Sequence, residues 1–138
     1  MIAYIDASVL LRVVLRQRNR LREWRGIRAG IASALVQVEC LRALDRLRLS
    51  RRLSDADLAV RREAVFWLTG EMTVVDISGP ILERASQALP SPLGTLDAIH
   101  LATALSWKER AAGDLVMATH DTRLGLAARG CGLAVVGL

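Results

Sequence analysis

The sequence is poor in several residue types on which binding or catalysis commonly depends. It holds one Tyr, one Phe and three Trp, so a platform of aromatic side chains for stacking nucleic-acid bases is not expected. Its two cysteines, Cys40 and Cys131, match no metal-ligand spacing, and we interpret them as free structural thiols. No Gly-rich phosphate loop and no Ser/His/Asp triad is evident. These absences leave the acidic residues as the main candidates for chemistry.

Long apolar runs are also missing, because Arg or Asp interrupts each run before it reaches membrane-spanning length. The first run has no basic leader and is followed at once by Asp6, so we expect no signal peptide, no membrane association and a cytoplasmic protein. An apolar content of 52% argues against disorder. A length of 138 residues fits one domain with a substantial core, so we predict a single domain over residues 1–138.

Positive charge is supplied almost wholly by arginine. The formal net charge is +5, and Lys108 is the only lysine among 19 basic residues. Arginine suits bidentate pairing with phosphate or carboxylate, and a basic domain invites a nucleic-acid partner. Six arginines gather in residues 16–28. This segment is either an RNA-backbone surface or partner-docking clamp, or the solvated face of a helical hairpin.

Strand and helix patterns alternate along the chain with short turns between them. Apolar runs predict strands at residues 2–5, 31–32, 72–77 and 115–118, with a last strand in LAVVG. Ser8, Ser33, Ser54 and Thr95 are the predicted N-caps of helices between them. The alternation predicts an α/β domain with a mostly parallel central sheet and helices on both faces.

Four acids lie where such a fold would bring them to one edge of the sheet. Asp6 and Asp121 end strands, Asp97 lies in the first turn of a helix, and Glu39 lies in the helix after the second strand. Each has a simpler explanation, such as capping for Asp97 or an i,i+3 ion pair with Arg42 for Glu39. If all four meet, their repulsion requires bound protons or cations. Oxygen ligands of this kind suit Mg²⁺ or Mn²⁺, and such ions promote phosphodiester hydrolysis.

Neither histidine is assigned a role in this chemistry. His100 lies one turn after Asp97, where it either hydrogen-bonds that acid or packs as a structural histidine. His120 adjoins Asp121 and points to the opposite side if the strand continues. We expect a packed, structural His100 and no catalytic histidine.

At these residues the sequence resembles the PIN-domain family, and within it the toxins of VapBC toxin–antitoxin pairs. The matching pieces are YIDASVLL, SALVQVECLRAL, TLDAIHLATAL and MATHDTRL, which occur in the family's order and span nearly the whole chain. The resemblance implies a three-layer α/β/α sandwich. One departure is Gly94, where many relatives carry an Arg before the Thr-Leu-Asp stretch.

The resemblance also implies an activity and its partners. It implies a Mg²⁺- or Mn²⁺-dependent ribonuclease toxin whose metal-binding and catalytic acids match Asp6, Glu39, Asp97 and Asp121. Ser8 and Thr119 match hydroxyl positions that support these acids or the substrate. The implied substrate is tRNA or ribosomal RNA, and the implied partners are a cognate antitoxin, which inhibits the toxin, and a second copy in a homodimer.

Two other interpretations fit parts of this pattern. A phosphoacceptor receiver domain also gathers acids at strand ends, but it needs a lysine near the last strands. Lys108 lies in or just after the helix of Asp97 instead. The second alternative is a non-catalytic PIN-like module that binds RNA or an antitoxin without cutting, and the presence of all four acids argues against it.

Overall fold

The computed structural model describes residues 1–138 and contains five strands, six α-helices and one 3₁₀ helix. In chain order these are β1 (Ile2–Ile5), α1 (Ala7–Val14), the 3₁₀ helix η1 (Arg22–Gly26), β2 (Ala29–Ser33), α2 (Leu35–Leu49), α3 (Asp55–Gly70), β3 (Thr73–Val75), α4 (Gly79–Ala85), α5 (Thr95–Ala111), β4 (Val116–Ala118), α6 (Thr122–Gly130) and β5 (Ala134–Val136). None of the helices combines the length and apolar character needed to cross a bilayer.

The five strands form one sheet in the order β3-β2-β1-β4-β5, and every neighbouring pair is parallel. β1 is central, and its residues Ala3, Tyr4 and Ile5 have no exposed surface. Such complete burial is typical of a parallel strand that is covered on both faces. β2 and β3 are added on one side of β1, and β4 and β5 on the other. The carboxyl end of β1 is therefore a topological switch point, which is where open α/β sheets bind ligands.

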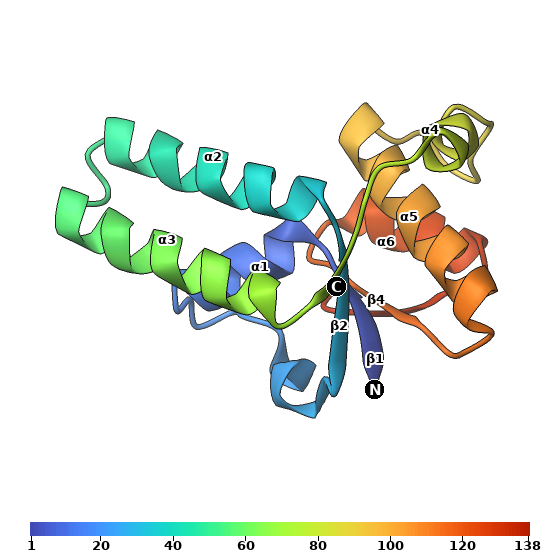
Figure 1. Ribbon diagram of the computed structural model, residues 1–138, viewed down its shortest axis with the longest axis horizontal. Helices are drawn as coiled ribbons and strands as arrows, with labels where there is room; N and C mark the ends of the chain where they lie inside the picture. The colour runs from blue at the N-terminus through green and yellow to red at the C-terminus, as the bar shows by residue number, and fades with distance from the viewer.

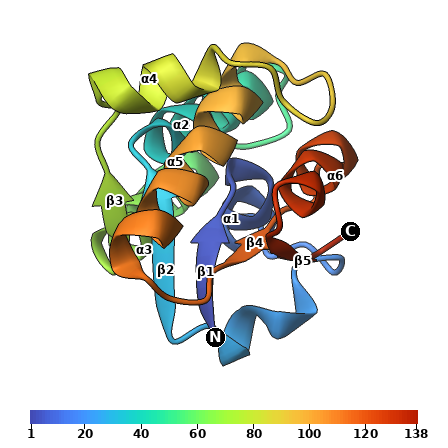
Figure 2. The same ribbon diagram turned by 90° about the vertical axis from the view of Figure 1, so that its right-hand side faces the viewer.

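Helices cover both faces of the sheet, so the predicted three-layer α/β/α sandwich with a parallel sheet is confirmed. α1, α2 and α3 lie on one face and α4, α5 and α6 on the other (Figure 1). Figure 2 shows α5 running across the front of the sheet, with α4 and α6 on either side of it. One buried cluster, which includes Leu10, Val36 and Leu44, fills the α1–α3 side, and a second, which includes Leu101 and Leu124, fills the other.

Helix α1 begins differently from the sequence prediction. The N-cap is Asp6, whose carboxylate accepts a hydrogen bond from the Ser8 amide, so the prediction that Ser8 is the cap was wrong. β1 runs to Ile5 and α1 begins at Ala7, which leaves Asp6 as the single connecting residue. An acid is favoured there because it meets unpaired helix amides.

Two more predicted caps were wrong, and one was right. Gly94, with extended backbone, is the N-cap of α5, and Thr95 is already helical. Ala34 is the N-cap of α2 because Ser33 still belongs to β2. Ser54 caps α3 as predicted, since its hydroxyl oxygen accepts from the Asp57 amide at 3.0 Å.

Candidate active site

Asp6 lies at the carboxyl end of the central strand and is 5% exposed. Its Oδ2 accepts hydrogen bonds from the Ser8 hydroxyl at 2.5 Å, the Thr119 hydroxyl at 2.9 Å and the Ser8 amide at 3.3 Å. Three donors on one oxygen fix the orientation of the carboxylate. The other oxygen, Oδ1, lies 4.0 Å from the His100 Nε2 atom and accepts no hydrogen bond.

Thr119 and Asp121 follow the neighbouring strand β4. The Thr119 hydroxyl donates to Asp6 and accepts from the Asp121 amide at 2.9 Å, so one side chain ties both acids together. Asp121 is the N-cap of α6, and its Oδ1 accepts from the Arg123 and Leu124 amides at 2.8 and 3.0 Å. As in Asp6, one carboxylate oxygen serves the fold and the other has no hydrogen-bond partner in the chain.

Glu39, on α2, is held from across the sheet by a histidine of α5. The His100 Nε2 atom lies 2.6 Å from Glu39 Oε2, and its Nδ1 atom lies 2.8 Å from the Tyr4 hydroxyl. Glu39 makes no ion pair with Arg42, so the simpler explanation proposed for it does not hold. His100 contacts Glu39 rather than Asp97, and it is fully buried, as expected for a structural histidine.

The protonation states of Tyr4 and His100 follow from their surroundings. Burial lowers the pKa of His100, but the hydrogen bond that its ring donates to Glu39 and the charges of Asp6, Glu39 and Asp97 together raise it above its ordinary value. Burial, together with the charges of Asp6 and Glu39, raises the pKa of Tyr4, so the phenol keeps its proton. Either protonation state of the imidazole therefore presents an N–H to Glu39, because a carboxylate only accepts.

Asp97 lies in the first turn of α5, is partly exposed and makes no hydrogen bond within the chain. Its pKa is raised chiefly by burial and then by the charges of Asp121, Asp6 and Glu39, while His100 partly opposes the rise. A carboxylate that feels three other carboxylates and has no donor of its own is the least satisfied of the four. It therefore has the most to gain from a cation.

All four carboxylates line one cavity of about 480 Å³. The cavity is also bordered by the Ser8 side chain and by two arginines of α2, Arg42 and Arg46. These arginines lie three and seven residues after Glu39, which places all three on one face of the helix. The structure thus brings the predicted acids together and adds guanidinium groups suited to phosphate.

As the side chains lie, no three of the His, Cys, Asp or Glu residues are arranged to hold a metal ion. The chemistry of the donors nevertheless fits Mg²⁺ or Mn²⁺, because the cavity wall offers carboxylate oxygens and no thiol. Asp6, Glu39 and Asp121 each keep one oxygen without a hydrogen bond, and Asp97 keeps both. Binding would require these oxygens to draw together around the ion.

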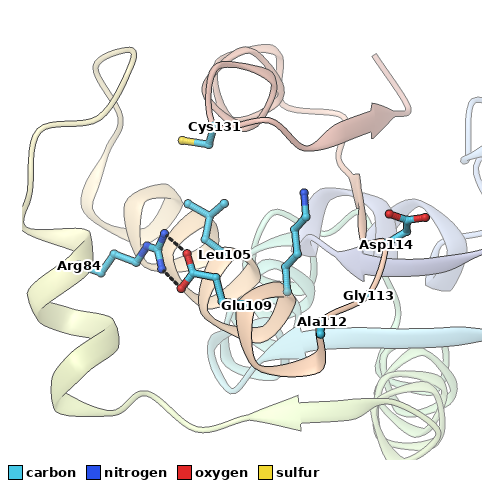
Figure 3. A pocket seen from close by; sticks show the side chains of 8 residues that line it. Arg84, Leu105, Glu109, Ala112, Gly113, Asp114 and Cys131 are labelled. Carbon is cyan, nitrogen blue, oxygen red and sulfur yellow. Dashed lines mark hydrogen bonds and ion pairs between the residues drawn. The ribbon is translucent and has the colours of Figure 1, made fainter.

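A larger hollow, of about 800 Å³, lies away from these residues, and Figure 3 shows its lining. Arg84 of α4 donates to both carboxylate oxygens of Glu109 on α5, at 2.6 and 2.8 Å. The side chains of Cys131 and Leu105 border the same space. None of the predicted site residues reaches it, so its size does not make it the candidate active site.

Sequence reasoning missed the parts that Tyr4 and His100 play around Glu39. The i,i+3 spacing of Asp97 and His100 does place both on one face of α5, which was the available signal. The partner, Glu39, lies 61 residues earlier, so the contact depends on how α2 and α5 meet across the sheet. No local sequence pattern predicts this contact between α2 and α5.

Comparison with known proteins agrees with this architecture. The family model described as PIN domain matches residues 3–130. The chain is 32% identical over 138 residues to Ribonuclease VapC46 of Mycobacterium tuberculosis (strain ATCC 25618 / H37Rv), with 96% of this chain and 95% of that protein covered. The crystal structure of PAE2754 from Pyrobaculum aerophilum superimposes with a TM-score of 0.64 at 20% identity, over 99% of this chain and 90% of the other. This last likeness supports the fold alone.

The family model covers most of the chain, and the curated relative is aligned over nearly the whole of both sequences. The four matching motifs occur in the same order as the elements that carry the acids. The chain therefore belongs to the PIN-domain family and, within it, to the VapC type.

Proposed function

We propose that this chain is a metal-dependent endoribonuclease, the toxin of a type II toxin–antitoxin pair. The observation that carries the proposal is the cavity whose wall holds Asp6, Glu39, Asp97 and Asp121. The family and the ribonuclease relative agree with it. When bound, Mg²⁺ or Mn²⁺ would supply the charge that activates water and stabilises the leaving oxygen in phosphodiester hydrolysis.

The residues in and around the cavity have three roles in this proposal: binding the metal, orienting the acids and contacting the RNA. The four carboxylates would hold the metal through the oxygens that the fold leaves free. Ser8 and Thr119 orient Asp6 through its other oxygen, and His100 does the same for Glu39. Two arginines on the cavity wall, Arg42 and Arg46, would contact phosphates of the RNA strand.

The proposal includes a protein partner that closes the cavity. Val38 and Leu96 border it and remain 56% and 47% exposed, which gives an apolar rim beside the acids. An antitoxin segment with apolar side chains and a basic group would cover this rim and neutralise the carboxylates. A homodimer, tRNA or ribosomal RNA as substrate, and a cytoplasmic location remain predictions from the resemblance.

The test is RNA cleavage by purified, metal-free protein to which Mn²⁺ or Mg²⁺ is returned. Asp6→Asn keeps an oxygen that can cap α1 but removes the charge. Losing outer partners of metal ligands typically costs 10–100-fold in activity, so losing a ligand should cost at least roughly 100-fold. Asp76→Asn, which neutralises an exposed acid outside the cavity, is the matched control and should cleave like wild type.

Thermal melting of the same proteins distinguishes a protein that does not bind the metal from one that binds the metal but does not cleave RNA. Mn²⁺ should raise the midpoint of wild type and of Asp76→Asn but not of Asp6→Asn, because an ion that binds only the native state stabilises it. A wild-type protein that binds RNA yet leaves it intact with either metal would favour the non-catalytic binding module instead.

A further inference from the structure

A third hollow, of about 500 Å³, opens between the segment that joins α1 to η1 and the end of the chain. Four arginines line it, and we call it the arginine hollow: Arg12, Arg18, Arg20 and Arg22. Glu23 is the only acid on its wall. None of the predicted catalytic acids borders it, so it is separate from the cavity described above.

The arginine hollow carries an excess of positive charge, because Glu23 is the only acidic side chain beside its four arginines. None of its four guanidinium groups takes part in an ion pair. Arg12 donates to the Asn19 carbonyl at 3.1 Å, which holds the segment against α1, and the other three make no side-chain hydrogen bond. Like charges gathered in this way repel one another, and a bound anion would relieve the repulsion. Guanidinium groups match the oxygens of phosphate in shape as well as charge.

The arginine hollow lies directly beside the candidate active site. His120 lines the hollow, and the next residue, Asp121, lines the cavity of the four acids. Arg12 lies one helical turn after Ser8, which borders that cavity, so their Cβ atoms are about 5–6 Å apart. The His120 amide donates to the Ser8 hydroxyl at 2.9 Å, and the His120 ring is fixed by a 2.6 Å hydrogen bond from Nδ1 to the Gly137 carbonyl. A strand leaving the cavity on this side meets the arginines next.

We propose that the arginine hollow binds a backbone phosphate of the RNA strand, next to the phosphate that is cut. The inference rests on the proposed nuclease function and adds a second contact to it. The lining favours RNA over a protein segment, because Leu21 and Leu138 are its only apolar side chains and a protein interface needs a larger apolar core.

The experiment measures binding of a short fluorescein-labelled single-stranded RNA by anisotropy, over a series of salt concentrations. All proteins carry Asp6→Asn so that the RNA stays intact. Arg18→Gln with Arg20→Gln removes two exposed charges whose side chains make no hydrogen bond or ion pair within the fold. Arg110→Gln with Arg129→Gln removes two exposed charges elsewhere and keeps the same net charge as the matched control.

The hollow variant should bind roughly tenfold more weakly at low salt, and the slope of log affinity against log salt should fall by about 0.7, which is the contribution of one phosphate contact to a single strand. The control should lose less than about twofold. Equal losses in both variants would overturn the proposal, because net charge alone would explain them. Unchanged RNA binding together with lost binding of a poly-glutamate peptide would overturn it in favour of an acidic protein partner.

Failure of this proposal and failure of the proposed function give different results. If wild type cleaves RNA while the hollow variant binds RNA normally, the hollow proposal fails and the nuclease stands. If the hollow variant loses RNA binding but wild type never cleaves, the nuclease fails and the hollow remains an RNA-binding surface.

Discussion

Tyr4→Phe isolates the hydroxyl that supports His100, and its effect can be worked out from the structure. The two residues are fully buried, and the Tyr4 hydroxyl lies 2.8 Å from His100 Nδ1. The substitution keeps the ring and removes one oxygen, so the Nδ1 atom loses its partner inside the core. An unsatisfied buried polar group costs about 1–3 kcal/mol. For a chain of this length we expect the melting midpoint to fall by roughly 3–15 °C.

Activity should respond far less than stability. Glu39 still accepts from His100 Nε2, because a carboxylate offers no proton of its own. RNA cleavage by Tyr4→Phe should therefore stay within about threefold of wild type at a temperature where both are folded. The assays are urea unfolding of the metal-free protein and initial cleavage rates with Mn²⁺.

Thr69→Val is the matched control for this prediction. Thr69 is buried on α3, away from Tyr4 and His100, and its hydroxyl donates to the Val65 carbonyl at 2.9 Å, an oxygen that the helix already pairs. Its loss should cost less than about 1 kcal/mol. An unfolding free energy for Tyr4→Phe equal to that of wild type would refute the reasoning. So would a large fall in cleavage, because it would mean that the phenol, not Glu39, sets the position of the imidazole proton.

Further predictions concern pH, backbone and thiols. Because the folded-state pKa values of His100 and Asp97 are raised, the native metal-free protein keeps protons that the unfolded chain has lost. These contributions are complete below the unfolded values and are lost as pH rises through the folded ones, so the urea midpoint should fall as pH rises above 3.8, through the raised pKa of Asp97, and fall again above 6.5, through the raised pKa of His100. Gly137→Ala should lower the free energy of unfolding by more than about 2 kcal/mol, because φ is +99° and the added Cβ would lie 2.6 Å from the Thr119 carbonyl oxygen. Gly132→Ala should lower it by only about 1 kcal/mol in the same unfolding assay, because φ is +77° but the space around the added Cβ is open. A thiol reagent should label the partly exposed Cys131 quickly under native conditions and leave Cys40 unmodified. Cys40 should be unreactive because burial raises the pKa of its thiol to about 12.

The positions of the acids could be predicted because they follow from strand order. Apolar runs that end at Asp6 and just before Thr119 fix two parallel strands, and parallel strands bring their carboxyl ends to one edge. Glu39 and Asp97 then follow from the helices beside that edge. Their roles as metal ligands remain predictions, whereas their common cavity is a property of the structure.

The helix caps and the histidine could not be predicted in the same way. Capping depends on which residue turns the chain out of a strand, and a strand one residue longer or shorter moves the cap from Ser8 to Asp6 or from Ser33 to Ala34. The partner of His100 depends on contacts between α2 and α5, which sequence spacing does not encode. Local sequence patterns therefore predicted the helices and strands, but not the cap residues or the side-chain contacts between helices.

The central position of β1 has a consequence for how the protein is made. The two walls of the cavity come from opposite ends of the chain, because Asp6 ends the first strand and Asp121 follows the fourth. A partly synthesised chain on the ribosome lacks α5, β4 and the last two carboxylates, so it holds no complete site. On the proposed function, the site is complete only when residues 95–138 have folded against the first part of the chain.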